Sequence, residues 1–193
     1  AVSNCVTVFV NDVTPGIVAA DQTICSGGDP SAFTVTTPSA GSGSLSYQWQ
    51  SSTTDCSSGF TNITGANAAA YDPPAGLLVT TYYRRIVTST LNTVTCSAVS
   101  NCITVTINNV TAGTVGNDQT ICSGGDPAAF TETLAATGNG TITYQWQSST
   151  TNCTSGFTDI AGATGATYDP PAGLVATTYY RRITISTLNG VAC

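Results

Sequence analysis

The segment Tyr47-Gln-Trp-Gln-Ser-Ser-Thr-Thr54 decides the fold, because it combines a strand signature with a tryptophan and occurs twice in the chain. Side chains of a strand alternate between two faces, so Tyr47 and Trp49 share one face and the glutamines share the other. The same eight residues return at 144–151. We therefore predict that Trp49 and Trp146 are core residues, one in each copy.

Outward from this segment, the whole sequence repeats at a constant interval. Gln22 recurs as Gln119, 97 residues later, and the alignment continues without a gap to the last residue. Periods of about 20 to 50 residues are typical of solenoids, whereas about 100 residues is the size of an ordinary domain. The repeat predicts two domains, at 12–109 and 110–193.

The phase of the repeat places a spare strand at the front of the chain. Residues 1–8 match 98–105, so we interpret 1–11 as the last strand of a preceding repeat. Repeat 2 has no such strand after Cys193. Two explanations stay open: the chain is a segment of a longer array, or it joins head to tail with further copies of itself. In the second case, Val2–Val10 of one copy occupies the open edge of repeat 2 in the next.

The composition indicates a folded chain without a surface for nucleic acid. Charged residues make up 7% of the sequence, hydrophobic residues make up 41%, and the net charge is −6 with four cationic side chains. Binding to a phosphate backbone requires a basic surface, which four arginines do not provide. No apolar run approaches the length of a membrane span. We expect neither nucleic-acid binding nor a transmembrane segment.

Residue types and turn signals together predict an all-β fold. The chain is rich in Thr, Val, Ile and Tyr, which favour strands, and poor in helix formers. Short apolar segments alternate with turn clusters such as Ser26-Gly-Gly-Asp-Pro30. About seven strands with one central tryptophan is typical of an immunoglobulin-like β-sandwich. We predict two tandem immunoglobulin-like sandwich domains.

A later strand in each repeat is expected to contribute a buried arginine. One of its faces keeps isoleucine in both repeats, at Ile86 and Ile183, so we predict that this face points inward. Tyr82 and Arg84 share it. A buried guanidinium needs a partner, and Asp72 is the candidate. The corresponding predictions for repeat 2 are a core Tyr179 and an ion pair of Arg181 with Asp169.

The cysteines favour disulfides over metal ligation. The chain has eight cysteines, no histidine and no CxxC pair, which favours structural disulfides and an oxidising, extracytoplasmic location. The sandwich topology favours three bonds: Cys25 with Cys56, Cys96 with Cys102, and Cys122 with Cys153. Other pairings stay open, including links between neighbouring repeats. Cys5 and Cys193 are candidates for bonds between repeats or copies.

Five motifs, in a fixed order, resemble the tandem immunoglobulin-like repeats of giant cell-surface proteins from gliding and related Bacteroidota. The motifs are Gln22-Thr-Ile-Cys-Ser-Gly-Gly-Asp-Pro30, Tyr47-Gln-Trp-Gln-Ser-Ser-Thr-Thr54, Tyr71-Asp-Pro-Pro-Ala-Gly-Leu77, Thr80-Thr-Tyr-Tyr-Arg-Arg-Ile86 and Ser100-Asn-Cys-Ile-Thr-Val-Thr106. The resemblance implies export by the type IX secretion route and a position outside the outer membrane. It also implies a role as adhesin, stalk or filament.

Catalysis has little support in the sequence. The chain has no histidine for acid–base work and no lysine for a Schiff base, and its single glutamate, Glu132, corresponds to Val35 in repeat 1. The aspartates that precede proline are explained by turn formation. We expect a structural module of an extracellular stalk, adhesin or filament, and not an enzyme.

Two kinds of ligand remain as alternatives. No cofactor is expected, but calcium at a domain boundary would use Asp12, Asp21 or Asp118. The second alternative is an adhesin that binds glycans or proteins. It would use the variable loops Ser39–Ser44 and Thr137–Thr141, or aromatic platforms at Tyr47, Tyr82 and Tyr83.

Overall fold

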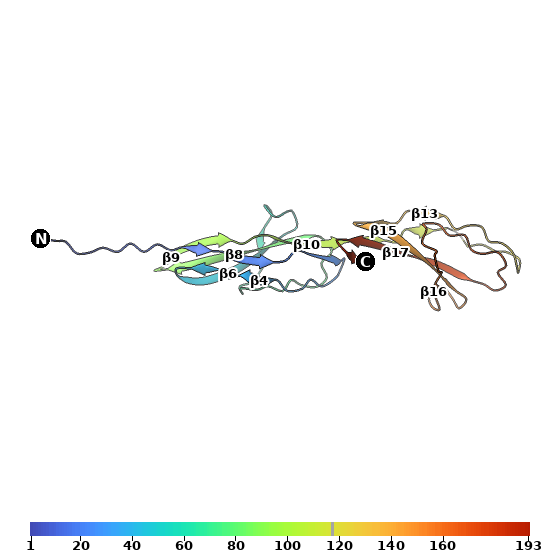
Figure 1. The fold of residues 1–193 in the computed structure, drawn as a ribbon, viewed down its shortest axis with the longest axis horizontal. Coiled ribbons are helices and arrows are strands. Elements are labelled where there is room, and N and C mark those ends of the chain that lie inside the picture. The colour runs from blue at the N-terminus through green and yellow to red at the C-terminus, as the bar shows by residue number, and fades with distance from the viewer. Residues whose placement is uncertain (117) are drawn as a thin grey trace. The chain divides into compact units, whose positions relative to one another are not determined.

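The computed structural model describes residues 1–116 and 118–193, and these residues form strands and no helix. The prediction of an all-β chain is confirmed. The described part of the chain accordingly contains no helix able to cross a membrane. The chain divides into two compact units, Ala1–Ile107 (unit 1) and Asn108–Cys193 (unit 2), each drawn in Figure 1. Asn108 belongs to unit 2, and its side-chain amide donates to the carbonyls of Ser186 and Val191.

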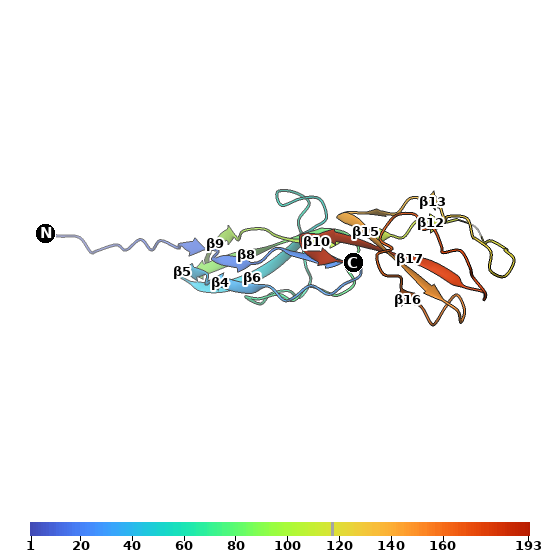
Figure 2. The same ribbon diagram turned by 45° about the vertical axis from the view of Figure 1, so that its right-hand side comes forward.

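Unit 1 is built on a large sheet with the strand order β3-β10-β8-β6-β7, seen from two directions in Figures 1 and 2. The long strand β8 pairs with β6, with β9 and with β10, all antiparallel. Two smaller pairs, β1-β5 and β2-β4, complete the unit. The bounds are β1 (Val13–Thr14), β2 (Ile17–Ala19), β3 (Gln22–Cys25), β4 (Thr34–Thr37), β5 (Ala40–Gly41), β6 (Ser44–Ser52), β7 (Thr61–Asn62), β8 (Thr81–Leu91), β9 (Val94–Val99) and β10 (Ile103–Asn108).

Unit 2 repeats this plan with a smaller sheet, in the order β16-β15-β17-β18. The pairs β11-β14 and β12-β13 correspond to β1-β5 and β2-β4. Residues 119–122, which correspond to β3, form no strand. The bounds are β11 (Val110–Thr111), β12 (Thr114–Val115), β13 (Glu132–Leu134), β14 (Thr137–Gly138), β15 (Thr141–Ser149), β16 (Thr158–Asp159), β17 (Tyr179–Leu188) and β18 (Val191–Ala192).

An aromatic cluster around one tryptophan forms the core of each unit. In unit 1, Trp49 is fully buried, and its ring centroid lies 5.7 Å from that of Phe33. Its indole N–H donates to the carbonyl of Ala68, so the polar atom is satisfied inside the core. Trp146 is equally buried in unit 2 and packs against Phe130. The prediction of Trp49 and Trp146 as core residues is confirmed.

The face of β8 that points inward is the opposite of the one predicted. Trp49 pairs directly with Arg85, and cross-strand partners share a face. Arg85 and Tyr83 are therefore buried, while Tyr82 and Arg84 are only partly buried. The isoleucine kept in both repeats lies on the outer face. In unit 2, Arg182 and Tyr180 take the inward positions in place of Arg181 and Tyr179.

The predicted ion pairs of Arg84 with Asp72 and of Arg181 with Asp169 are wrong. Asp72 and Asp169 are exposed. Arg84 instead donates through Nε to Oε1 of Gln50 at 2.7 Å and lies over the ring of Phe60. Arg181 makes the same two contacts, with Gln147 and Phe157.

The buried arginine has different partners in the two units. Arg85 donates to the carbonyls of Ala69 and Pro15 and to the hydroxyl of Ser39, without a carboxylate. Burial lowers the pKa of Arg85, and the neighbouring Tyr47 opposes that shift. In unit 2, Arg182 forms an ion pair with Glu132, with Nη1 and Oε1 2.8 Å apart. The buried guanidinium thus has a carboxylate partner in unit 2, through Nη1, and a hydroxyl partner in unit 1, through Nη2.

Candidate functional site

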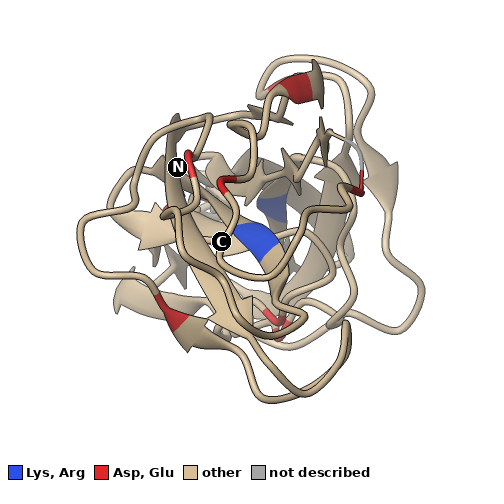
Figure 3. Cartoon of the chain, turned by 90° about the vertical axis from the view of Figure 1, so that its right-hand side faces the viewer, with Lys and Arg blue, Asp and Glu red and all other residues tan. Residues whose placement is uncertain are grey.

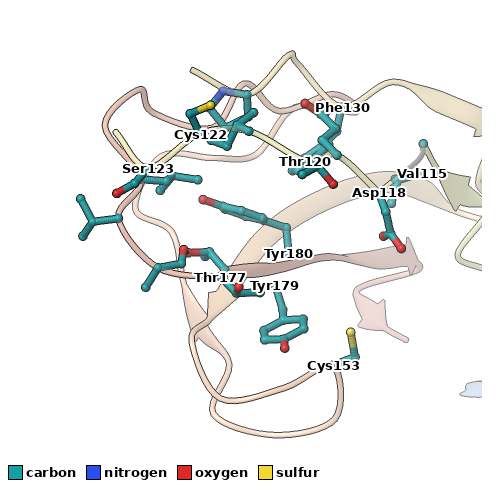
Figure 4. A pocket seen from close by; sticks show the side chains of 18 of the residues that line it. Val115, Asp118, Thr120, Cys122, Ser123, Phe130, Cys153, Thr177, Tyr179 and Tyr180 are labelled. Carbon is teal, nitrogen blue, oxygen red and sulfur yellow. The ribbon is translucent and has the colours of Figure 1, made fainter. Parts of the chain in front are cut away.

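Unit 2 carries an open groove of about 640 Å³, which is the candidate functional site. Two segments form its walls, residues 115–116 with 118–123 and residues 174–180, and the other lining residues are Pro127, Phe130, Trp146 and Cys153. Figure 4 shows Tyr180 in the middle of the groove, with Thr120 and Cys122 on one side and Thr177 on the other. The core of unit 2 is therefore accessible from one edge of its sheet.

The equivalent place in unit 1 is filled by β10. Its residues Ile103, Thr104 and Val105 pair with Tyr83, Tyr82 and Thr81 of β8. The residues 97 positions later are Tyr180, Tyr179 and Thr178, and all three line the groove. On its other side β10 pairs with β3. Residues 119–122 correspond to β3 and form the opposite wall of the groove. The groove in unit 2 is thus lined by the counterparts of the residues that lie on either side of β10 in unit 1.

β10 completes the core of unit 1 with three apolar side chains. Ile103, Val105 and Ile107 are 1%, 0% and 2% exposed. Among the described residues and apart from prolines, Trp146 is the one buried apolar side chain of unit 2, against eight in unit 1. Ile121, the counterpart of the partly buried Ile24, is exposed at the groove. The smaller core of unit 2 follows from the unfilled groove.

Hydrogen bonds position β10 in unit 1, and their acceptors recur in unit 2. The backbone N–H of Thr104 donates to Oδ1 of Asp21 at 2.8 Å. The side chain of Asn101 accepts from the N–H of Val18 and donates to its carbonyl. The counterparts of Asp21 and Val18 are Asp118 and Val115, and both line the groove. The groove therefore contains the groups that could form the same hydrogen bonds with a strand placed in it.

Residues 1–10 have the sequence of this strand and no place in the core of unit 1. They form no strand, every one of them is exposed, and in Figure 1 they extend away from the sheets of unit 1. Val6, Val8 and Val10 correspond to the three buried side chains of β10, yet they are 80%, 84% and 77% exposed. Exposed apolar side chains with the alternation of a buried strand indicate an interaction segment.

A tyrosine occupies the equivalent position in both units, Tyr83 beside β10 and Tyr180 in the groove, and burial raises its pKa in each. Burial, followed by the neighbouring Tyr71, raises the pKa of Tyr83 to about 12. Burial and Tyr168 also raise the pKa of Tyr180. Tyr83 lies against Phe33 with ring centroids 5.1 Å apart, and Tyr180 lies against Phe130 at 5.2 Å. The walls of the groove therefore already have the aromatic packing of the filled site.

The structure overturns the predicted disulfides. Cys56 bonds to Cys102, so its predicted bond to Cys25 and the bond of Cys96 with Cys102 are wrong. Cys122 and Cys153 are both free, so their predicted bond is also wrong. The loop that holds Cys56 reaches the start of β10, where the Cα atoms of the bonded pair are 5.7 Å apart.

The remaining cysteines divide into bonded and free. Cys25 and Cys193 are also disulfide-bonded, whereas Cys5 and Cys96 are free, like Cys122 and Cys153. Cys193 was a candidate for a bond between repeats or copies, and it is disulfide-bonded within this chain. Two disulfides favour an oxidising compartment over a reducing one.

The residues predicted for calcium do not assemble into a metal site. Asp12 caps the N–H of Val13, and Asp21 accepts from Thr104, so each has a structural partner. Asp118 lies in the groove instead. In residues 1–116 and 118–193, no three cysteine or carboxylate side chains gather as metal ligands. Figure 3 shows the acidic residues at separate positions on the chain.

The tyrosines and loops proposed for glycan binding make contacts within the fold. Tyr83 is a core residue, and Tyr47 lies under the guanidinium of Arg85. In the variable loops, Ala40–Gly41 and Thr137–Gly138 pair with β1 and β11. These contacts leave fewer side chains for a ligand than we expected.

The missed functional features share one signal, which is the repeat itself. One repeat alone does not identify Tyr83 and Arg85 as the buried pair, because either face of the strand fits the residue types. It does not identify the Cys56–Cys102 bond either, because several cysteine pairings are possible. Superposing the two repeats places Cys153 and Tyr180 beside the position that β10 occupies in unit 1. That comparison points to the groove.

Comparison with known proteins identifies a family but no relative of known function. The chain matches none of the curated proteins and none of the solved structures with which it was compared. A family model described as a domain of unknown function matches residues 14–109 and again 111–193. Because these two matches span nearly all of the sequence, the chain belongs to this family, DUF8696.

Proposed function

We propose that this protein is a structural module of an extracellular stalk, adhesin or filament, and that it joins to further copies of itself by strand donation. Residues Ser3–Val10 of one copy enter the groove of unit 2 in the next copy and act there as β10 acts in unit 1. Each unit is then an immunoglobulin-like sandwich, and the chain has no catalytic role. The oxidising location favoured by the disulfides is the cell surface.

One observation carries the proposal: the exposed segment and the groove reproduce the two sides of an interaction seen within unit 1. Val6, Val8 and Val10 correspond to Ile103, Val105 and Ile107, which are buried in the core. The wall residues of the groove correspond to those that contact β10. Strand addition to an open sheet edge supplies backbone hydrogen bonds and places alternate side chains in pockets.

Rough magnitudes favour insertion. Full burial of a valine side chain stabilises by about 1.5–3 kcal/mol, and three valines enter the groove together. New backbone hydrogen bonds contribute about 1 kcal/mol each. Association costs at least about 4 kcal/mol in lost translational and rotational freedom. Because Asn11 is already anchored to the carbonyls of Ser89 and Val94, the donated strand is held close to its own unit 1.

The test is the mass of the full chain in solution as its concentration rises. We expect chains of increasing length by sedimentation and by electron microscopy. The substitution Val8→Asp should abolish them, because it places a carboxylate where Val105 is fully buried in unit 1. We expect this substitution to leave folding unchanged, since the Val8 side chain is 84% exposed.

Phe9→Asp is the matched control. Phe9 neighbours Val8 but corresponds to Thr106, which is not buried in β10. We expect Phe9→Asp to retain assembly within about twofold. A protein that remains monomeric at all concentrations would contradict the proposal. Equal loss of assembly in both variants would also contradict it, because it would indicate association through an exposed apolar tail without a defined register.

A further inference from the structure

We infer that the donated strand is locked by a disulfide between Cys5 of one copy and Cys153 of the next. This inference rests on the proposed strand donation and adds to it the covalent bond that makes the joint permanent. Cys5 and Cys153 are both free and exposed in the isolated chain. Cys153 lines the groove, as Figure 4 shows.

Unit 1 contains the same bond within one chain. Cys102, which directly precedes β10, bonds to Cys56 in the loop that follows β6. Adding 97 to Cys56 gives Cys153, and subtracting 97 from Cys102 gives Cys5. A strand that enters the groove in the register of β10 therefore brings the two thiols to the positions of a bonded pair. The Cα atoms of that pair in unit 1 are 5.7 Å apart, within the usual range for a disulfide.

The polar contacts on either side of the cysteine fix this register. In unit 1, Asn101 bonds to the backbone of Val18, and the N–H of Thr104 donates to Asp21. Asn4 and Thr7 occupy these positions in the donated strand, opposite Val115 and Asp118 of the groove. Cys5 lies between Asn4 and Thr7. A shift by one residue would turn its side chain to the other face of the sheet.

The bond forms by oxidation and needs an electron acceptor. Each thiol loses a proton, the two sulfur atoms join, and two electrons pass to an external disulfide, which is reduced to two thiols. In the proposed extracellular location, such an oxidant is a small-molecule disulfide or the disulfide of a thiol oxidase. Oxidised glutathione serves as the oxidant in the test.

The test uses a chain in which Cys96→Ser and Cys122→Ser remove the other two free thiols. Incubation with oxidised glutathione should give a ladder of covalent multimers on non-reducing electrophoresis. Mass spectrometry should identify a peptide that joins Cys5 to Cys153. Adding Cys5→Ser should abolish the ladder, while sedimentation still shows non-covalent assembly. Adding Val8→Asp instead should lower the rate of cross-linking at least tenfold, because the strand no longer enters the groove.

The outcomes separate the bond from the strand donation. If the Cys5→Ser chain assembles but the parent forms no Cys5–Cys153 peptide, the bond is refuted and strand donation stands. If neither chain assembles, strand donation fails. If Val8→Asp cross-links as fast as the parent, the thiols react without insertion, and the inference is wrong.

Discussion

Units 1 and 2 align without a gap over their shared positions, yet one is closed and the other is open. In unit 1, β10 covers Tyr83 and pairs with β3. In unit 2 no described strand lies in that place, and residues 119–122 form no strand although they match β3. A strand requires a partner for its backbone groups, so the same residues adopt different structure in different surroundings. The comparison shows that β10 acts as a separable part of the fold.

The largest expected effect comes from opening unit 1. Val105→Asp puts a carboxylate into the core position that Val8 would fill in unit 2 of another copy. We expect a loss of about 4 kcal/mol of unfolding free energy in unit 1, from lost apolar burial and a buried charge. Amide hydrogen exchange of β6 and β8 measures it separately from unit 2. Val8→Asp is the control and should leave the exchange of unit 1 unchanged.

The next largest effect is a decrease in the stability of unit 1 at alkaline pH. Tyr83 has its pKa raised from 10 to about 12, so the folded unit 1 keeps a proton that the unfolded chain loses. Its stabilising contribution is complete below pH 10 and decreases as the pH rises toward 12, by about 1.4 kcal/mol per pH unit. Denaturation across this range should show the decrease.

Two variants sharpen the alkaline comparison. Tyr83→Phe removes the ionisable group and should flatten the decrease. Ultraviolet titration of Tyr180 should show its pKa rising further when assembly closes the groove. An unchanged titration in assembled material would contradict closure at this tyrosine.

The smallest expected effect concerns the buried arginines. Glu132→Val introduces the residue that unit 1 has at the equivalent position, Val35, and it removes the ion pair with Arg182. We expect a cost of about 1–2 kcal/mol, because part of the Glu132 side chain is exposed and the carbonyls of Ala166 and Ala112 still accept from Arg182.

A double variant tests whether a hydroxyl can replace the carboxylate. In unit 1, Ser39 accepts from Arg85, and its counterpart in unit 2 is Ala136. Adding Ala136→Ser to Glu132→Val should recover about half of the lost stability, as measured by urea denaturation. Strict additivity of the two substitutions would show that these partners are not interchangeable.

The predictions from sequence succeeded where one residue type has one plausible environment. Trp49 and Trp146 were correctly placed in the core, because a tryptophan on an alternating strand is seldom left in water. Tyr82 and Arg84 were chosen over Tyr83 and Arg85 on the weaker ground that an isoleucine recurs. Both parities of a Tyr-Tyr-Arg-Arg strand fit the residue types, and the pairing with Trp49 distinguishes them only in three dimensions.

The sequence by itself determined the all-β class, the repeat of 97 residues and the match between residues 1–8 and the last strand of repeat 1. These follow from residue types and their order along one chain. The tertiary structure decided which face of β8 is buried, that Cys56 bonds to Cys102, and that unit 2 has a groove where unit 1 has β10. Those features depend on contacts between residues tens of positions apart, and local patterns do not distinguish among the arrangements that the chain could adopt.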